Sequence, residues 1–180
     1  MGGTHRSRWI EFPEIKELRP TPDRVRETLF NWLGQTLDGK RCLDLFAGSG
    51  ALGFEAMSRG AADVVMVEQD RAAFHALQQN CEKLACEQVT LRCESALDFL
   101  RRSRADYNVI FLDPPFQSDY LVKVLPLVAD RLAPGGLVYV ETGTPFQPDA
   151  VWQVTRHAKA GNVHYQLLQL VPNVKQERDD

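Results

Sequence analysis

The chain has 180 residues, of which 44% are hydrophobic and 25% are charged, a composition typical of a globular protein with one domain. Its formal net charge of -3 argues against a broad nucleic-acid-binding face, although a local basic cluster is compatible with it. No apolar run reaches the roughly 18 residues of a membrane-spanning helix, and the four cysteines lack the CxxC spacing of a metal site.

Apolar spacing predicts that helices and strands alternate after a basic extension at 1–18, which is expected to be irregular or to form a partial hairpin. Helices are expected at 25–37, 51–58, 70–84, 96–102 and 120–132, and strands at 42–46, 64–67, 89–91, 109–112 and 137–140. Segments 152–158 and 164–170, separated by Gly161-Asn162, predict a closing hairpin. The alternation favours a doubly wound, mostly parallel, seven-stranded α/β sheet of Rossmann type that ends in this antiparallel hairpin. A charged tail at 175–180 is expected to be disordered.

A glycine-rich turn joins the first expected strand to its helix. Residues 48–53 match GxGxxG, which lets the backbone approach a ligand closely, and Glu68 ends the next strand where a ribose-binding carboxylate belongs. A dinucleotide and S-adenosylmethionine are both candidate ligands for such a turn. Asp44, just before the turn, favours S-adenosylmethionine, because a carboxylate repels a pyrophosphate but attracts an amino group.

The tetrapeptide Asp-Pro-Pro-Phe at 113–116 follows the fourth expected strand. Two prolines donate no backbone hydrogen bonds, so the strand ends there in a stiff, extended loop. Open α/β sheets bind their ligands at this end of their strands. A carboxylate, unpaired carbonyls and an aromatic ring are suited to hold a flat ring that carries an amine. Taken alone, the tetrapeptide is as compatible with a strand-ending turn that carries an apolar plug as with such a ligand-binding loop.

Together, residues 44–50, Glu68 and residues 113–116 resemble class I S-adenosylmethionine-dependent methyltransferases that modify exocyclic amines. The upstream segment 18–33, LRPTPDRVRETLFNWL, resembles the RsmD family, and this resemblance covers nearly the whole chain. It implies a methyltransferase domain over 19–174. It also implies methyl transfer to the 2-amino group of one guanine, guanine 966 of 16S small-subunit rRNA. We expect a cytoplasmic monomer that meets its RNA within a small-subunit assembly particle, without a membrane or a metal.

The resemblance also implies roles for individual residues. In the catalytic loop of Asp113, Pro114, Pro115 and Phe116, the aromatic ring stacks on a flipped base while the carboxylate and the Pro114 carbonyl accept hydrogen bonds from its amine. The expected cofactor-binding residues are Asp44, Phe46, Ala47, Gly48, Ser49, Gly50, Glu68, Gln69, Asp70, Ser95, Ala96 and Asp113. Relatives often have Asn or Asp at the position of Ser95, whose shorter hydroxyl is a less decisive acceptor for adenine.

Arginines near the first expected helix are candidates for RNA contact. They are Arg6, Arg8, Arg19, Arg24 and Arg26. Because Arg24 and Arg26 lie two apart on a helix, they do not share one narrow face. One of them is expected to reach RNA or cofactor while the other pairs with Asp23 or Glu27. An adenine-amine methyltransferase is the alternative function, since an acid-Pro-Pro-aromatic loop serves both bases, and a non-catalytic RNA-binding protein is disfavoured by the intact motifs.

Overall fold

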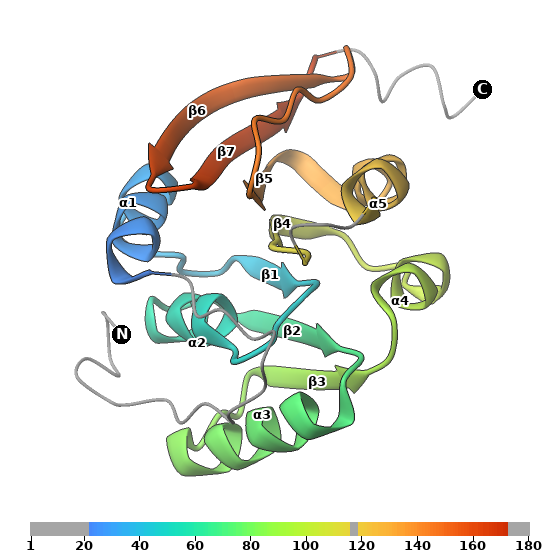
Figure 1. The fold of residues 1–180 in the computed structure, drawn as a ribbon. Helices are drawn as coiled ribbons and strands as arrows, with labels where there is room; N and C mark the ends of the chain where they lie inside the picture. The colour runs from blue at the N-terminus through green and yellow to red at the C-terminus, as the bar shows by residue number, and fades with distance from the viewer. Residues whose placement is uncertain (1–21, 116–118, 173–180) are drawn as a thin grey trace.

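The computed structural model describes residues 22–115 and 119–172 (Figure 1). Several sequence predictions therefore lie outside the described residues: the basic extension at 1–18, the tail at 175–180, and the side chains of Arg6, Arg8, Arg19 and Phe116.

A single mixed sheet forms the centre of the described part of the chain. Its strands are β1 (Arg41–Asp44), β2 (Asp63–Glu68), β3 (Val89–Cys93), β4 (Tyr107–Leu112), β5 (Leu132–Thr142), β6 (Trp152–Ala160) and β7 (Val163–Leu170). They lie in the order β3-β2-β1-β4-β5-β7-β6, with parallel pairing from β3 to β5 and antiparallel pairing of β7 with β5 and β6. This arrangement confirms the predicted doubly wound α/β fold with its closing hairpin.

Helices cover both faces of the sheet (Figure 1). They are α1 (Asp23–Leu33), α2 (Ala51–Ser58), α3 (Arg71–Leu84), α4 (Ala96–Arg102) and α5 (Tyr120–Ala129). The first three pack on one face, where Phe30, Phe54 and Phe111 are buried. The last two pack on the other face over Ile110 and Leu112. Successive residues of β4 thus enter opposite cores, which is why this strand is continuously apolar.

Two segments differ from the sequence prediction by more than two residues. The first helix was expected to extend to residue 37, but it ends at Leu33 because Gly34 follows with a φ of 93°. Leu37 is still buried, since its backbone nitrogen bonds the carbonyl of Arg59 at 2.8 Å and the turn places its side chain in the core. Its apolar character therefore mimicked another helical turn.

The segment before the fifth expected strand also differs. We expected Pro134 and Gly135 to end a helix, whereas α5 ends at Ala129 and β5 begins at Leu132. The proline and glycines lie inside β5 at an irregularity, because the pairing passes from Tyr107–Leu132 directly to Val109–Leu137. Gly135, with a φ of 71°, accommodates the extra residues of this bulge. No helix among the described residues is long and apolar enough to cross a bilayer.

Candidate active site

The carboxylate of Asp44 ends β1 and is 1% exposed. Its Oδ2 accepts a hydrogen bond from the backbone nitrogen of Gly53, in the first turn of α2, at 3.0 Å. Within the described part of the chain its Oδ1 is buried without a hydrogen-bond partner. Burial raises the pKa of Asp44 to about 7; the backbone N–H groups of Gly53 and Phe46 oppose the rise, and the charge of Glu68 adds to it. Since buried polar atoms are normally paired, this oxygen is suited to bind a cationic group of a ligand.

The turn after β1 has a conformation that requires glycine. Gly50 has a φ of 82°, and a Cβ there would lie 2.4 Å from the ring of Phe54 and 2.6 Å from Leu77. The turn is closed by a hydrogen bond from the nitrogen of Gly50 to the carbonyl of Ala47 at 2.7 Å. The backbone of the turn therefore packs directly against the helices behind it, which holds it in one conformation.

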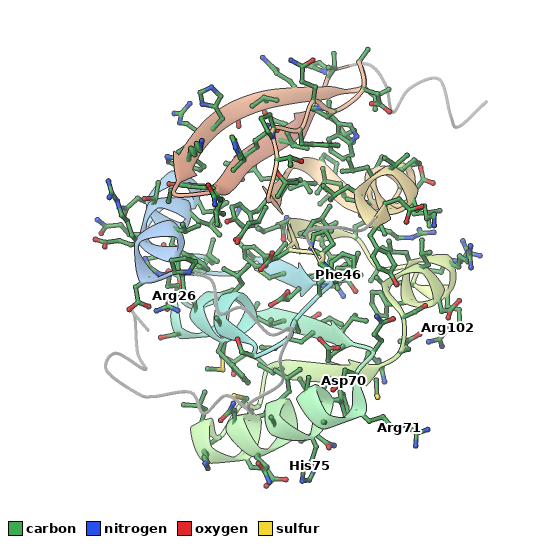
Figure 2. All side chains as sticks on the ribbon, viewed as in Figure 1. Arg26, Phe46, Asp70, Arg71, His75 and Arg102 are labelled. Atoms are coloured by element: carbon green, nitrogen blue, oxygen red, sulfur yellow. The ribbon has the colours of Figure 1, made fainter. Side chains whose placement is uncertain are left out.

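Glu68 connects the glycine turn to the start of the next helix. Its Oε2 accepts a hydrogen bond from the nitrogen of Gly48 at 2.8 Å, and its Oε1 accepts one from the nitrogen of Asp70 at 2.7 Å. Asp70 in turn caps α3 by accepting a hydrogen bond from the nitrogen of Ala73 at 2.8 Å. Each carboxylate oxygen of Glu68 retains a second lone pair, so the acid can also accept hydrogen bonds from ribose hydroxyls. Asp70 borders this position (Figure 2), and its neighbour Gln69 is exposed.

Ser95 follows β3 and caps α4. Its hydroxyl accepts a hydrogen bond from the nitrogen of Asp98 at 3.1 Å and donates one to the carboxylate of the same residue at 2.7 Å. The hydroxyl expected to contact adenine thus also holds the first turn of the helix, where Ala96 is buried. The adenine contact stays a prediction.

The Asp-Pro-Pro loop continues directly from β4, beside the turn that follows β1. The two segments are joined by a hydrogen bond from the nitrogen of Leu45 to the carbonyl of Phe111 at 3.1 Å. Asp113 is partly buried and Pro114 is buried, whereas Pro115 is exposed. The structure therefore brings the predicted catalytic acid to the same edge of the sheet as Asp44.

The predicted residue Phe46 lies on the opposite face of the sheet from Asp44. Its ring centroid is 5.5 Å from that of Tyr120, in an edge-on contact at the start of α5, and Figure 2 shows Phe46 between β1 and α4. Phe46 also packs against the core under α4 and α5. Its side chain thus anchors the turn on the α4–α5 side.

The two predicted arginines on α1 have different environments. Arg24 is exposed. Arg26 donates a hydrogen bond to Asp23 at 2.6 Å, and its Nε lies 3.7 Å from the buried carboxylate of Glu55, which also pairs with Arg59 at 2.8 Å (Figure 2). The pairing of Arg26 with Asp23 agrees with the expectation for one of the two arginines, and the contact of the other, Arg24, with RNA or cofactor stays a prediction.

Sequence reasoning missed one acid at this edge of the sheet. Glu141, next to the last residue of β5, is 3% exposed, and its Oε2 accepts a hydrogen bond from the Tyr139 hydroxyl at 2.9 Å. Burial raises the pKa of Glu141, and the Tyr139 hydrogen bond opposes the rise. The available signal was an acid that follows the apolar run at 137–140, the same signal that identified Asp44 and Asp113.

The acids at the ends of four neighbouring strands lie on one side of the sheet. In order across β2, β1, β4 and β5 they are Glu68, Asp44, Asp113 and Glu141. The residues just before them enter the core under α4 and α5, namely Val67, Leu43, Leu112 and Val140. Since successive side chains of a strand alternate between faces, Glu68, Asp44 and Glu141 point to the side of α1, α2 and α3. Asp113 follows β4 and is placed on the same side by the action of its charge on the hydroxyl of Tyr139, which is buried in the core of that side. We call the four acids the acidic row.

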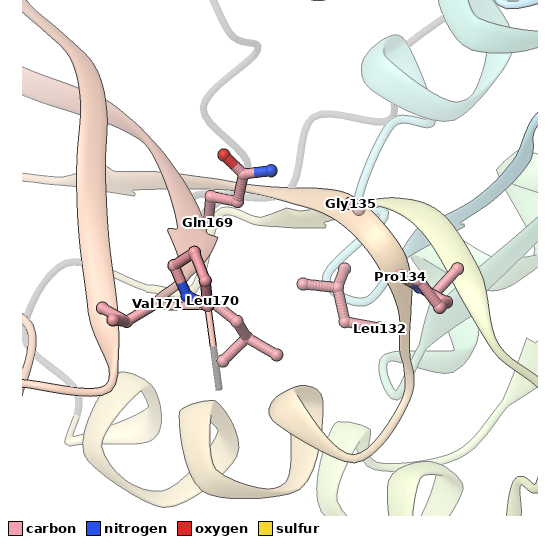
Figure 3. Close-up of a pocket in the computed structure, with 9 residues that line it drawn as sticks. Leu132, Pro134, Gly135, Gln169, Leu170 and Val171 are labelled. Atoms are coloured by element: carbon pink, nitrogen blue, oxygen red, sulfur yellow. The ribbon is translucent and has the colours of Figure 1, made fainter. Parts of the chain in front are cut away.

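A cavity of about 140 Å³ lies away from the acidic row (Figure 3). Leu132, Pro134 and Gly135 line it from the beginning of β5, and Leu170 and Val171 line it from the end of β7. Because it is at the opposite end of β5 from Glu141 and has no charged lining residue, it is not part of the site. The described residues contain no group of three His, Cys, Asp or Glu side chains that could hold a metal ion.

The parallel sheet, the glycine turn with its acids and the Asp-Pro-Pro loop define a class I S-adenosylmethionine-dependent methyltransferase. The family model described as "Conserved hypothetical protein 95" matches residues 1–169. The chain belongs to this family, the RsmD family that the sequence resembles.

Individual relatives agree with this assignment. The chain is 42% identical over 175 residues to ribosomal RNA small subunit methyltransferase D of Escherichia coli strain K12, covering 94% of this chain and 88% of the relative. It is 39% identical to the protein of the same name from Haemophilus influenzae, covering 94% and 92%. A solved structure, the putative methyltransferase yhhF from Escherichia coli, superimposes with a TM-score of 0.84 at 40% identity and covers 94% of this chain and 95% of its own.

Proposed function

We propose that this enzyme transfers a methyl group from S-adenosylmethionine to the exocyclic 2-amino group of a guanine in 16S rRNA, guanine 966 in the family's numbering of the RNA. The observation that carries the proposal is the position of Asp44 and Asp113 on one side of the neighbouring strands β1 and β4. One acid is suited to the amino group of the cofactor and the other to the amine of the base. The names of the relatives support rRNA of the small subunit as the substrate.

The residues present fit the cofactor. Oδ1 of Asp44 is buried and has no partner among the described residues, so it is suited to accept a hydrogen bond from the ammonium group. Glu68 is suited to accept hydrogen bonds from the ribose hydroxyls. S-adenosylmethionine, when bound, supplies a methyl group on a positively charged sulfur. The glycine turn, whose conformation requires Gly50, allows its backbone to lie close to this ligand.

The loop after β4 positions the methyl acceptor. A base edge inside a helix does not reach a buried methyl group, so the guanine leaves its stack. Asp113 and the carbonyl of Pro114 accept hydrogen bonds from its 2-amino group and orient the nitrogen lone pair. The negative charge of Asp113 offsets the positive charge that develops on the nitrogen during transfer. Positioning and electrostatics thus account for most of the acceleration, and Phe116 is assigned the stacking role.

RNA binding is assigned to Arg24 of α1 and to the arginines that precede this helix in the chain. Arg24 is exposed there and supports the proposal, while Arg6, Arg8 and Arg19 precede it in the chain. With a net charge of -3, the protein has a limited electrostatic attraction for naked RNA. We therefore assign the substrate to a small-subunit assembly particle, and the enzyme to the cytoplasm as a monomer.

The decisive experiment is methylation of unmodified small-subunit particles, followed by mass mapping of the rRNA. We expect one methyl group per rRNA, on the 2-amino group of guanine 966. An N6-methylated adenine would establish the alternative function, and a methylated guanine elsewhere would correct the position. Purified naked 16S rRNA serves as the comparison, and its faster methylation would contradict the assignment to a particle.

A further inference from the structure

Glu141 lies beside the catalytic acid on the neighbouring strand. Leu112 of β4 pairs with Val140 of β5, and the next residues of the two strands are Asp113 and Glu141. Adjacent parallel strands are about 4.8 Å apart, and both side chains point to the same side of the sheet. The charges of both acids also act on the Tyr139 hydroxyl, whose pKa is raised first by its burial and then by Glu141 and Asp113. The two carboxyl groups are therefore close neighbours.

Tyr139 holds the carboxyl group of Glu141 in one orientation. Its hydroxyl stays protonated because of its raised pKa, and it donates to Oε2 at 2.9 Å. Tyr165 lies across from Glu141 on β7, and its ring stacks on that of Trp32 with centroids 5.3 Å apart. Because Tyr139 engages Oε2, Oε1 is the oxygen that a second donor would use. A buried acid held by one donor thus has a second oxygen available for a donor from a ligand.

Guanine carries two neighbouring donors that match two neighbouring acids. Its Watson–Crick edge presents the N1–H group next to the 2-amino group, whereas N1 of adenine carries no hydrogen and is an acceptor. Two carboxyl oxygens on adjacent strands complement the first pattern and oppose the second. The hydrogen bond from Tyr139 favours the ionised form of Glu141, in which Oε1 carries no hydrogen and can accept one from N1–H.

We propose that Glu141 is a specificity-determining residue that accepts a hydrogen bond from N1–H of the target guanine while Asp113 accepts one from its 2-amino group. This inference rests on the proposed function, and it means that a side chain of the enzyme selects guanine over adenine. Phe116, by contrast, is able to stack on either base, and the Asp-Pro-Pro loop holds an amine of either. Asp44 and Glu68 are assigned to the cofactor and Asp113 to the amine of the base. Glu141 is the one member of the acidic row that these assignments leave without a role.

The test compares guanine with 2-aminopurine at the target position of a ligated 16S rRNA. 2-Aminopurine keeps the 2-amino group but has no hydrogen on N1. We expect the wild-type enzyme to prefer guanine by about 10- to 100-fold in kcat/KM, the size of one charge-assisted hydrogen bond. In Glu141→Gln, Tyr139 orients the amide oxygen, so the amide NH2 faces the base and donates to N1 of 2-aminopurine. The preference is then expected to fall below about 3-fold or to reverse.

Controls separate the possible failures. Glu82→Gln, the same change at an exposed position of α3, is expected to keep the wild-type preference. Calorimetric binding of S-adenosylmethionine by Glu141→Gln checks that the variant is folded. Equal use of both bases by the wild-type enzyme, or an unchanged preference in Glu141→Gln, overturns the role of Glu141 alone. If the wild-type enzyme binds the cofactor but methylates neither RNA, the proposed function itself fails.

Discussion

The backbone nitrogen of Gly53 donates a hydrogen bond to Oδ2 of Asp44 at 3.0 Å, so the first turn of α2 holds one oxygen of this carboxylate. The other oxygen, Oδ1, is buried and has no partner among the described residues. An acid in this position is arranged for a cation before any ligand arrives. Its pKa of about 7 places its change of charge within the physiological range.

Removing the charge of Asp44 is expected to stabilise the free protein while strongly weakening cofactor binding. Because the folded-state pKa, about 7, lies above the ordinary 3.8, Asp44 favours folding at low pH, and this contribution is lost as the pH rises through 7. Asp44→Asn is therefore expected to raise the free energy of unfolding at pH 8 by up to about 4 kcal/mol. Its affinity for S-adenosylmethionine is expected to fall at least about 100-fold. Urea unfolding and calorimetry measure the two effects, and a less stable variant would contradict the first.

Cofactor binding by the wild-type protein is expected to strengthen as the pH rises toward 7. Below that value Asp44 is protonated, and a bound ammonium group requires the charged form, so binding at pH 6 releases a proton. Calorimetry in two buffers of different ionisation enthalpy measures this release. At pH 8.5 the release from Asp44 is expected to vanish, and equal release at both pH values would rule out Asp44 as its source.

Asp113→Asn is expected to separate binding from chemistry. The amide keeps the shape of the side chain but loses the charge that offsets the developing positive nitrogen, so kcat is expected to fall about 100-fold or more. The cofactor dissociation constant is expected to change less than about 3-fold, because Asp44 and Glu68 are unaltered. Single-turnover methylation and calorimetry test this pair of effects. Asp106→Asn, at an exposed position before β4, is the matched control.

Gly50→Ala is expected to destabilise the protein more than Gly135→Ala. Both glycines have positive φ values, 82° and 71°, so both substitutions strain the backbone by about 1–2 kcal/mol. Only at Gly50 does the new Cβ also meet a side chain, the ring of Phe54 at 2.4 Å, whereas the space around Gly135 is open. We expect an additional loss of about 1–3 kcal/mol at Gly50 in urea unfolding. Equal losses would show that the ring moves aside without strain.

The two arginines of α1 are expected to respond differently to substitution. Arg24→Glu is expected to weaken RNA binding and to flatten its dependence on salt, because an exposed phosphate contact is lost. Arg26→Ala is expected to lower the free energy of unfolding by about 1 kcal/mol, since it removes a partner of Asp23 and of the buried Glu55. Filter binding at several salt concentrations and urea unfolding measure these effects. An unchanged RNA affinity of Arg24→Glu would mean that the RNA binds to another surface of the protein.

Local patterns were sufficient for much of the fold and for three acids of the site. Asp44, Glu68 and Asp113 each follow an apolar strand, and the structure confirms that each lies at a strand end. The same pattern marks Glu141, but nothing in its immediate sequence distinguishes it from a solvated strand end. The prediction that the first helix extends to residue 37 was wrong for a related reason, because Leu37 reaches the core from a turn rather than from a helix, which ends at Leu33.

The sequence by itself determined the alternation of elements, the glycine turn and the proline loop, because turns, caps and apolar runs act over only a few residues. The tertiary structure alone decided which elements are neighbours. β1 lies between β2 and β4, and β4 lies beside β5, so the acids at four strand ends form one row. Leu112 pairs with Val140 although helix α5 lies between the two strands in the chain, and this long-range register brings Asp113 and Glu141 together.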